Sequence, residues 1–261
     1  LQQQLKLHSR LFTSNVNLNI NDLNIGDINN NFTLIDKKYA SDYDLTYYKF
    51  LHKKSGAEYI HIDRQDTDNV FCIAFRTPPY NDTGVPHILE HTVLCGSEKY
   101  PVRDPFFLLL RRSLKTFMNA MTANDFTMYP FSTQNLQDYK NLLSVYCDSV
   151  FFPLLRQEDF SQEGHRLDID DNNENEIIYK GVVFNEMKGA MSDTSSLYYQ
   201  AINNNLYNQS TYKYNSGGDP LNILDLTYNE LKEFHKLHYH PNNCIFYSYG
   251  TFNPLYNLNY I

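Results

Sequence analysis

The clearest chemical pattern in the sequence is His87-Ile88-Leu89-Glu90-His91. In a helix of about 3.6 residues per turn, positions 87, 90 and 91 share one face. Two imidazoles four residues apart can bind one metal ion, while the carboxylate lies beside it. Imidazole nitrogens at this spacing suit zinc, so the HxxEH pattern predicts a zinc site with hydrolytic chemistry.

The glutamate of this pattern is predicted to act as the general base. Glu90 lies next to a ligand without being needed as one, so it can take a proton from water and later deliver it to a leaving amine. The alternative interpretation is a surface helix in which the histidines are solvated and Glu90 is unpaired. In that case the helix would only stabilise the fold, through the packing of its apolar side chains Ile88, Leu89 and Val93.

A zinc hydrolase site needs three protein ligands and one open position. The third ligand must come from elsewhere in the chain, commonly from His, Asp or Glu, and spacing alone does not select it. A second cluster, His235, His238 and His240, offers ligands for another metal ion. Histidines near a helix end are more often solvated and favoured by the helix dipole, so we expect one zinc ion per chain.

The segment that carries HxxEH has its own helical signals. Asp82 or Thr83 is a candidate N-cap, Pro86 suits a first helical turn, and Gly96 is expected to end the helix. These signals place the motif on a helix independently of its chemistry.

Short strands and helices interleave irregularly along the rest of the chain, which favours a sheet with helices packed on it. Alternating apolar residues predict a hairpin from Ala57 to Arg76. The other expected elements are a helix from Pro105, two strands around the turn Thr122 to Asp125, a helix from Asn135 to Phe152, a strand HRLDI between the exposed loops QEDFSQEGH and DIDDNNENE, helices in VVFNEMKGAMSD and LTYNELKEFHKLHY, and a final strand CIFYSYG.

Composition limits the class of protein. The 261 residues are 42% hydrophobic, which suffices for a sizeable core, and the net charge of -8 argues against a nucleic-acid-binding protein. No apolar run approaches the length of about 20 residues that a membrane helix needs. The four cysteines, Cys72, Cys95, Cys147 and Cys244, form no CxxC pair and are expected to be free buried thiols.

The surroundings of the motif resemble a known family. HxxEH is the inverted zincin arrangement, and TGVPHILEHTVLCGSEKYPVRDPF is similar to the pitrilysin-type metallopeptidases, in particular their presequence protease and falcilysin branch. The resemblance continues through LKTFMNAMTANDFTMYPFST, YKGVVFNEMKGAMSD and FHKLHYHPNNCIFYSYG, and covers the chain from about Tyr48 to Gly250.

The resemblance implies roles for further residues. It makes Glu186, in VVFNEMKG, the third zinc ligand. The sequence itself offers Glu98 and His165 as rival candidates for that position. It also places Asn119 and Ala120 on an edge strand beside the metal, where an extended peptide adds as another strand and binds through main-chain hydrogen bonds. An ordinary hairpin strand is the alternative for these two residues.

The resemblance also implies an architecture. We expect an α+β fold, a largely antiparallel sheet flanked by helices as in the mitochondrial processing peptidase-like metallohydrolases, with an extended arm over residues 1–47 and the catalytic domain over residues 48–261. Relatives are longer chains, so the implied partners are unfolded peptides and a C-terminal half, in cis or as a partner chain. They work in mitochondria, plastids or digestive vacuoles.

Two functional hypotheses follow. The first is a zinc endopeptidase domain that cleaves short unstructured peptides, with His87, His91 and Glu186 on the metal and Glu90 as base. The second is a catalytically incomplete domain or subunit that binds peptides or a partner half through the same edge strand. An intact HxxEH motif favours the first.

Overall fold

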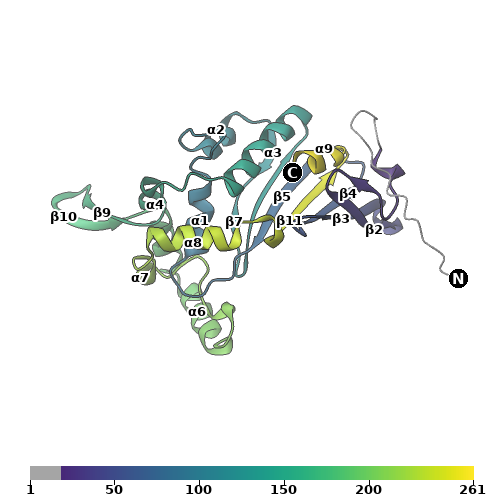
Figure 1. Cartoon of the computed structure of the whole chain (residues 1–261). Helices are drawn as coiled ribbons and strands as arrows, with labels where there is room; N and C mark the ends of the chain where they lie inside the picture. The colour runs from purple at the N-terminus through teal and green to yellow at the C-terminus, as the bar shows by residue number, and fades with distance from the viewer. Residues whose placement is uncertain (1–18) are drawn as a thin grey trace.

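The computed structural model describes residues 19–261 (Figure 1). The first 18 residues, which begin the expected arm, lie outside the described residues. Most of the described strands form one nine-stranded sheet with the order β1-β2-β3-β4-β11-β5-β8-β6, and β7 pairs with β8 beside β6. The strands of this sheet are β1 Ile28–Asn29, β2 Phe32–Ala40, β3 Leu45–His52, β4 Glu58–Asp63, β5 Asn69–Arg76, β6 Lys115–Met118, β7 Met121–Thr122, β8 Phe126–Thr133 and β11 Cys244–Gly250.

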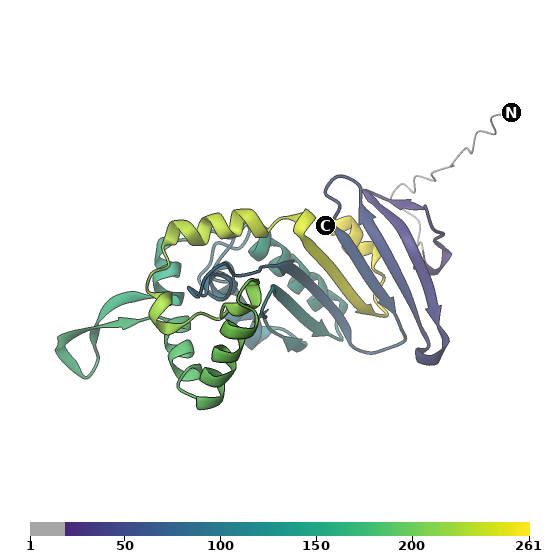
Figure 2. The same cartoon turned by 90° about the horizontal axis from the view of Figure 1, so that it is seen from below.

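The sheet is antiparallel except at one place, the parallel pair β4 and β11. The expected hairpin from Ala57 to Arg76 is therefore wrong. Both of its strands exist, but the C-terminal strand β11 lies between them, as the yellow strand in Figure 2 shows. Local alternation predicts that a segment is extended, whereas its neighbour in the sheet depends on contacts with a strand about 170 residues later in the chain.

The boundary expected after residue 47 falls inside strand β3. Strand β2 pairs with β3 along its length, and Phe32 and Leu34 of β2 are buried in the core. Before β2, Ile20 and Leu23 are buried as well. Residues 32–40 and 45–47 thus belong to the sheet, and the side chains of Phe32 and Leu34 pack in its core.

Helices pack on this sheet. Helix α3 contacts β5 and β8, and α1 contacts β7 and β8. The aromatic rings of Phe71, Phe131 and Tyr146 join sheet and helix, with 5.7 Å between the first two ring centroids and 5.3 Å between the last two. The helices are α1 Val85–Val93, α2 Pro105–Arg112, α3 Leu136–Phe151, α4 Gln157–Glu163, α5 Val182–Ala190, α6 Thr194–Leu206, α7 Pro220–Ile223, α8 Tyr228–His238 and α9 Leu255–Tyr260. The α+β class with a largely antiparallel sheet is confirmed.

The region after α3 differs most from expectation. The segment QEDFSQEGH, expected as a loop, contains helix α4, and its residues Phe160 and Glu163 are buried. The second expected loop contains the first half of strand β10, Asn173–Lys180, which pairs with β9, Arg166–Asp170, in a separate hairpin. This hairpin projects from the body of the molecule in both views (Figures 1 and 2).

The described helices are short or polar: none of them is both long and apolar enough to cross a membrane. The remaining predicted elements are confirmed within a few residues, including α2, α3, α8 and the strands around the turn at residues 123–125.

Candidate metal centre

Helix α1 carries the HxxEH motif in the interior of the molecule. His87 is 9% exposed and Glu90 is 7% exposed, so a surface helix with solvated histidines is ruled out. The expected N-caps, Asp82 and Thr83, are not used. Gly84 caps the helix instead, in the left-handed conformation at φ +67°, which glycine adopts without strain.

Gly84 allows a close approach that helps to hold the first histidine. A Cβ atom at this position would lie 2.6 Å from the carbonyl oxygen of Gly217. That same oxygen is 3.2 Å from Nδ1 of His87 and accepts its hydrogen bond. The loop around Gly217 therefore reaches the start of α1 because Gly84 has no side chain.

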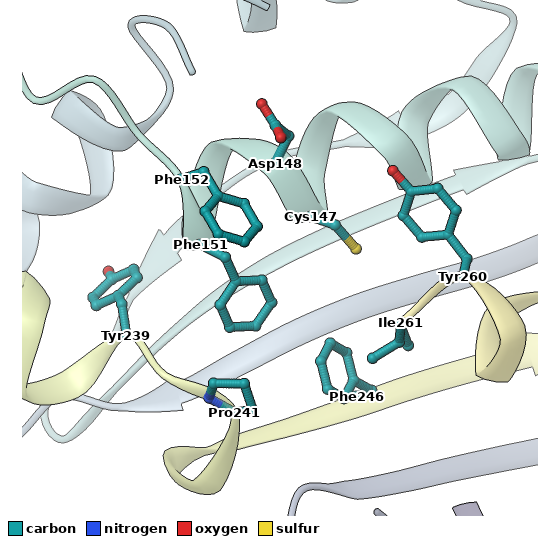
Figure 3. Close-up of a pocket in the computed structure, with 9 residues that line it drawn as sticks. All are labelled: Cys147, Asp148, Phe151, Phe152, Tyr239, Pro241, Phe246, Tyr260 and Ile261. Carbon is teal, nitrogen blue, oxygen red and sulfur yellow. The ribbon is translucent and has the colours of Figure 1, made fainter. Parts of the chain in front are cut away.

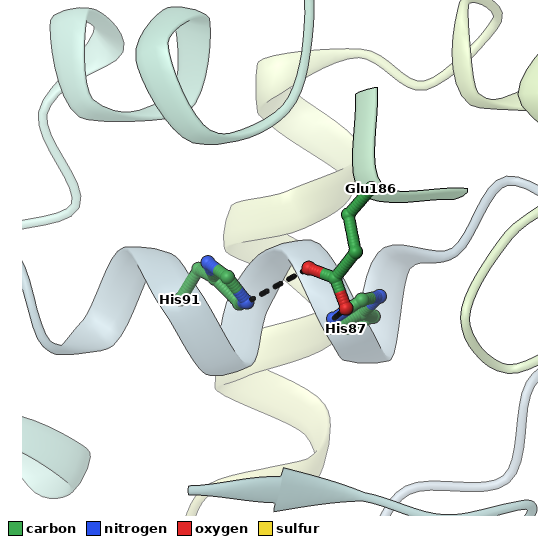
Figure 4. Close-up of side chains that lie close together, drawn as sticks. All are labelled: His87, His91 and Glu186. Carbon is green, nitrogen blue, oxygen red and sulfur yellow. Dashed lines mark ion pairs between the residues drawn. The ribbon is translucent and has the colours of Figure 1, made fainter. Parts of the chain in front are cut away.

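The third predicted ligand lies on a different helix, α5, and points at both histidines (Figure 4). Oε1 of Glu186 is 3.7 Å from Nε2 of His87, and Oε2 is 3.9 Å from Nε2 of His91. One ligand atom from each of the three residues lies within 4.8 Å of the others. Two imidazoles and one carboxylate at these separations fit a divalent metal ion that keeps an open coordination position. The three residues are therefore a candidate metal site.

The other ring nitrogens of the two histidines point away from Glu186 to fixed acceptors. His87 Nδ1 donates to the backbone oxygen of Gly217, and His91 Nδ1 lies 3.1 Å from Oε2 of Glu163. With Nδ1 protonated in both rings, both Nε2 lone pairs face Glu186. Glu163 was missed from the sequence because its segment was interpreted as a loop.

Several carboxylates act on His91. Burial lowers the pKa of this ring, but its hydrogen bond to Glu163 and the surrounding negative charges outweigh burial and raise the pKa above its usual value. The cluster thus attracts positive charge at the point where the two Nε2 atoms converge, which suits a cation.

Glu90 lies in the same cleft as the three candidate ligands. The cleft has a volume of about 700 Å³ and is lined by His87, Glu90, His91 and Glu186 together with residues of β7 and β8. Oε2 of Glu90 accepts a hydrogen bond of 2.6 Å from Thr122, a residue of β7. The carboxylate is therefore beside the candidate metal site and held by the neighbouring strand, and it is not a member of the converging group of three.

Asn119 and Ala120, which were expected on an edge strand, lie between β6 and β7 at the wall of the cleft. Strand β6 is the last strand of the sheet, so its outer side is an open edge. A smaller hollow of about 270 Å³ adjoins them and combines Glu90 and His91 with apolar side chains such as Leu94, Phe106 and Phe107.

The rival ligands lie elsewhere. Nε2 of His165 faces the backbone oxygen of Leu226 at 2.9 Å, and Glu98 is exposed in the loop before α2. In the second histidine cluster each ring faces a different backbone oxygen, those of Val150, Arg76 and Leu237. Within residues 19–261, no other three His, Cys, Asp or Glu residues bring ligand atoms together in this way.

A separate apolar pocket of about 370 Å³ lies between α3, β11 and α9 (Figure 3). Its titratable lining includes the Cys147 thiol, whose pKa is raised by burial, and Asp148. All four cysteines are free and buried, as predicted. The lining of this pocket contains no histidine, so the pocket does not offer a second metal site of the same kind.

The known sequences that resemble this chain are peptidases, in agreement with the candidate metal site. The model of the insulinase family, peptidase family M16, matches residues 76–203, and that of the peptidase M16 inactive domain matches residues 225–260. The mitochondrial presequence protease of Xenopus laevis is 55% identical over 228 residues, covering 87% of this chain and 22% of the relative. That of Schizosaccharomyces pombe is 53% identical over 88% of this chain and 23% of its own length.

Solved structures share the fold. Pitrilysin superposes with a TM-score of 0.67 at 18% sequence identity, and the match covers 85% of this chain and 23% of pitrilysin. A protease from Helicobacter pylori superposes with a TM-score of 0.65 at 19% sequence identity, and the match covers 79% of this chain and 46% of that protease. The chain thus spans about a fifth of the length of the curated relatives that it matches. With the sequence matches, the shared fold and the inverted HxxEH motif in agreement, the chain belongs to peptidase family M16, in its presequence protease branch.

Proposed function

We propose that this chain is the catalytic domain of a zinc endopeptidase that cleaves unstructured peptides. The observation that carries the proposal is the convergence of His87, His91 and Glu186 within 4.8 Å, with Glu90 in the same cleft. The relatives named presequence protease support the assignment to peptides.

Zinc is the metal that this donor set favours. Two neutral imidazoles and one carboxylate form a ligand set found in catalytic zinc sites. When bound, the ion supplies a Lewis acid that activates water and polarises a carbonyl group. The residues that would hold it are His87, His91 and Glu186, one ion per chain.

Glu90 performs the proton transfers. Its carboxylate accepts a proton from the attacking water and then delivers that proton to the amine that leaves when the peptide bond breaks. The hydrogen bond from Thr122 occupies one oxygen of the carboxylate, Oε2, and leaves Oε1 for this work. Because Glu90 is 7% exposed, bulk water does not compete strongly for that proton.

The substrate is proposed to bind as an added strand. An extended peptide laid along the open edge at β6 and β7 passes Asn119 and Ala120 and lies across the metal site. Main-chain hydrogen bonds do not read side chains, so this mode suits peptides of many sequences. The adjoining hollow beside Phe106 and Phe107 favours an apolar side chain near the cleaved bond.

The proposed partner of the chain is the remainder of the longer family architecture, in cis or as a partner chain. The curated relatives are about four to five times as long as the segment that they share with this chain. Since those relatives are named mitochondrial, we propose the mitochondrion as the location.

The test is hydrolysis of a quenched fluorescent peptide, unstructured and about 20 residues long, by the zinc-loaded chain. The Glu90→Gln variant keeps the ligands and the edge strand, so we expect it to bind zinc and peptide like the original chain and to lose hydrolysis. Equal turnover by the variant would rule out Glu90 as the base. Peptide and zinc binding without turnover by the original chain would favour a binding domain that needs its other half.

A further inference from the structure

We propose that Glu163 is a positioning residue of the metal site: its carboxylate holds the His91 ring so that Nε2 faces the metal. This inference rests on the proposed zinc site and adds a residue that is not one of its three ligands. Its basis is the geometry on the two sides of the His91 ring.

The two nitrogens of His91 face two different carboxylates. Nδ1 is 3.1 Å from Oε2 of Glu163, and Nε2 is 3.9 Å from Oε2 of Glu186. Of these two glutamates, Glu186 belongs to the group of converging ligand atoms and Glu163 does not. Glu163 therefore lies behind the ligand, on the side away from the metal.

The two carboxylates also differ in their exposure to solvent. The side chain of Glu186 is 53% exposed, whereas that of Glu163 is 7% exposed. Burying a carboxylate is costly unless hydrogen bonds satisfy it. Both oxygens of Glu163 are satisfied, since Oε2 accepts from His91 and Oε1 accepts a 2.9 Å hydrogen bond from Nε2 of Gln162.

Gln162 is itself anchored. Its Oε1 accepts a 2.6 Å hydrogen bond from the guanidinium of Arg103. The chain of contacts therefore runs from Arg103 at the surface through Gln162 and Glu163 to the metal ligand. Each member restricts the next one, so the orientation of the imidazole is set from outside the cleft.

The backbone brings Glu163 to this place. Gly164 follows it, and a Cβ at Gly164 would lie 3.3 Å from Cγ2 of Ile88 on α1, so α4 ends directly against the motif helix. A Cβ at Gly181, before α5, would collide with the carbonyl oxygen of Gly164. The same glycine contacts thus fix the end of α4 between the helices that carry His91 and Glu186.

Physically, a carboxylate behind the ligand does two things. First, it fixes the tautomer with the hydrogen on Nδ1, which leaves the Nε2 lone pair for the metal. Second, it raises the basicity of the imidazole, so that Nε2 donates its electron pair to the metal more strongly. Loss of such a partner typically weakens metal binding by about 10 to 100-fold.

The experiment measures the zinc Kd of the whole 261-residue chain by competition with a chromogenic chelator. We expect Glu163→Ala to weaken zinc binding by about 10 to 100-fold. Glu163→Gln keeps an acceptor for His91, but its new NH2 group faces the NH2 group of Gln162, so Gln162 must give up either this contact or the one with Arg103. We expect its zinc Kd to rise more than about threefold, but less than the Kd of the alanine variant rises. The visible spectrum of the cobalt-loaded variants should change in the same order.

The matched control is Glu158→Gln, which removes the same charge from an exposed position of the same helix and should leave Kd unchanged. A Kd for Glu163→Ala within twofold of the original chain would overturn the proposal. If the alanine variant does not fold, an unchanged Kd and cobalt spectrum for Glu163→Gln would overturn it equally. These readouts do not need hydrolysis, so they remain valid if the chain alone is inactive.

Discussion

The hydroxyl group of Thr122 donates a hydrogen bond of 2.6 Å to Oε2 of Glu90 and joins a short strand to the motif helix. Behind it, Oγ1 of Thr127 lies 3.4 Å from Oγ1 of Thr122 and 2.8 Å from that of Thr77. The proposed base is thus held from the side where the peptide substrate would bind, so substrate binding and proton transfer depend on the same strand.

Replacing Thr122 tests this link. Thr122→Val removes the donor at nearly constant volume, and a hydrogen bond to a charged group contributes about 1.5–3 kcal/mol. We expect kcat for peptide hydrolysis to fall by about 10 to 100-fold, with KM and the zinc Kd nearly unchanged. Thr122→Ser keeps the hydroxyl and should retain most of the activity. Equal rates for the valine and serine variants would contradict a role for this hydrogen bond.

The contact between Gly84 and Gly217 predicts a backbone effect on the metal site. Gly84→Ala places a Cβ at a positive φ and 2.6 Å from the oxygen that accepts from His87. We expect a stability loss of about 1–3 kcal/mol in urea unfolding and a weaker zinc Kd, because the acceptor must move.

The control for this change is Gly189→Ala in α5, where a Cβ would meet nothing within 4 Å. Alanine favours a helix interior by up to about 1 kcal/mol, so this variant should be as stable as the original chain or more stable. If Gly84→Ala matched it in both stability and zinc Kd, the close approach would have no consequence.

Zinc should stabilise the fold through the three ligands. A ligand that binds only the folded state raises its stability, so Tm should rise with zinc concentration and return to the metal-free value with a chelator. Glu186→Gln removes one charged ligand and should abolish most of this rise, whereas Glu176→Gln, at an exposed position of β10, should not. Calorimetry checks both, and an equal rise in Tm for the Glu186 variant would rule out its role as a ligand.

The sequence predicted the part of the site that depends on local periodicity. His87, Glu90 and His91 lie within five residues on one helix, so their shared face follows from helix geometry alone. Glu186 came from family resemblance, because its approach to the histidines depends on how α5 packs. Glu163 was missed because α4 is short and highly polar, and its only two buried residues are Phe160 and Glu163. Such a segment carries almost no apolar periodicity.

In the sheet, too, the features that depend on local sequence were predicted, and those that depend on contacts between distant segments were not. Strands β4 and β5 are close to the predicted strands, but each pairs with β11, whose position in the middle of the sheet no local pattern encodes. Strand β2 lies within the arm expected over residues 1–47, and its C-terminal half, such as Lys37 and Lys38, is polar. Its N-terminal half nevertheless contributes Phe32 and Leu34 to the core.

The four thiols should be unreactive in the folded chain. Burial raises the pKa of Cys72 and of Cys244 to about 12, and it raises the pKa of Cys95 and Cys147 as well. The thiolate is the reactive form, so at pH 8 a thiol reagent should modify all four slowly in buffer and quickly in denaturant. Mass spectrometry counts the modified residues. Rapid labelling of Cys95 in the folded chain would show that the site wall is more open than this packing allows.

A buried histidine far from the metal site should make stability depend on pH. His61 in β4 is 1% exposed, and its Nδ1 lies 2.8 Å from the hydroxyl oxygen of Ser248 in β11. Burial lowers the pKa of His61 to about 3. The folded chain therefore keeps this ring neutral down to about pH 3, whereas the unfolded chain protonates it below its ordinary pKa of about 6.5.

The sign of the effect follows from this difference. As the pH falls from 6.5 toward 3, the unfolded state takes up a proton that the folded state does not, so stability is lost. Between pH 7 and pH 5 the loss from His61 alone should be about 2 kcal/mol. Urea unfolding at both pH values with a metal chelator present measures it, and His61→Gln should reduce the pH dependence by that amount. His235 and His238, whose pKa values are also lowered by burial, contribute equally to both proteins and cancel in the comparison. An identical pH dependence for the variant would mean that His61 titrates in the folded chain.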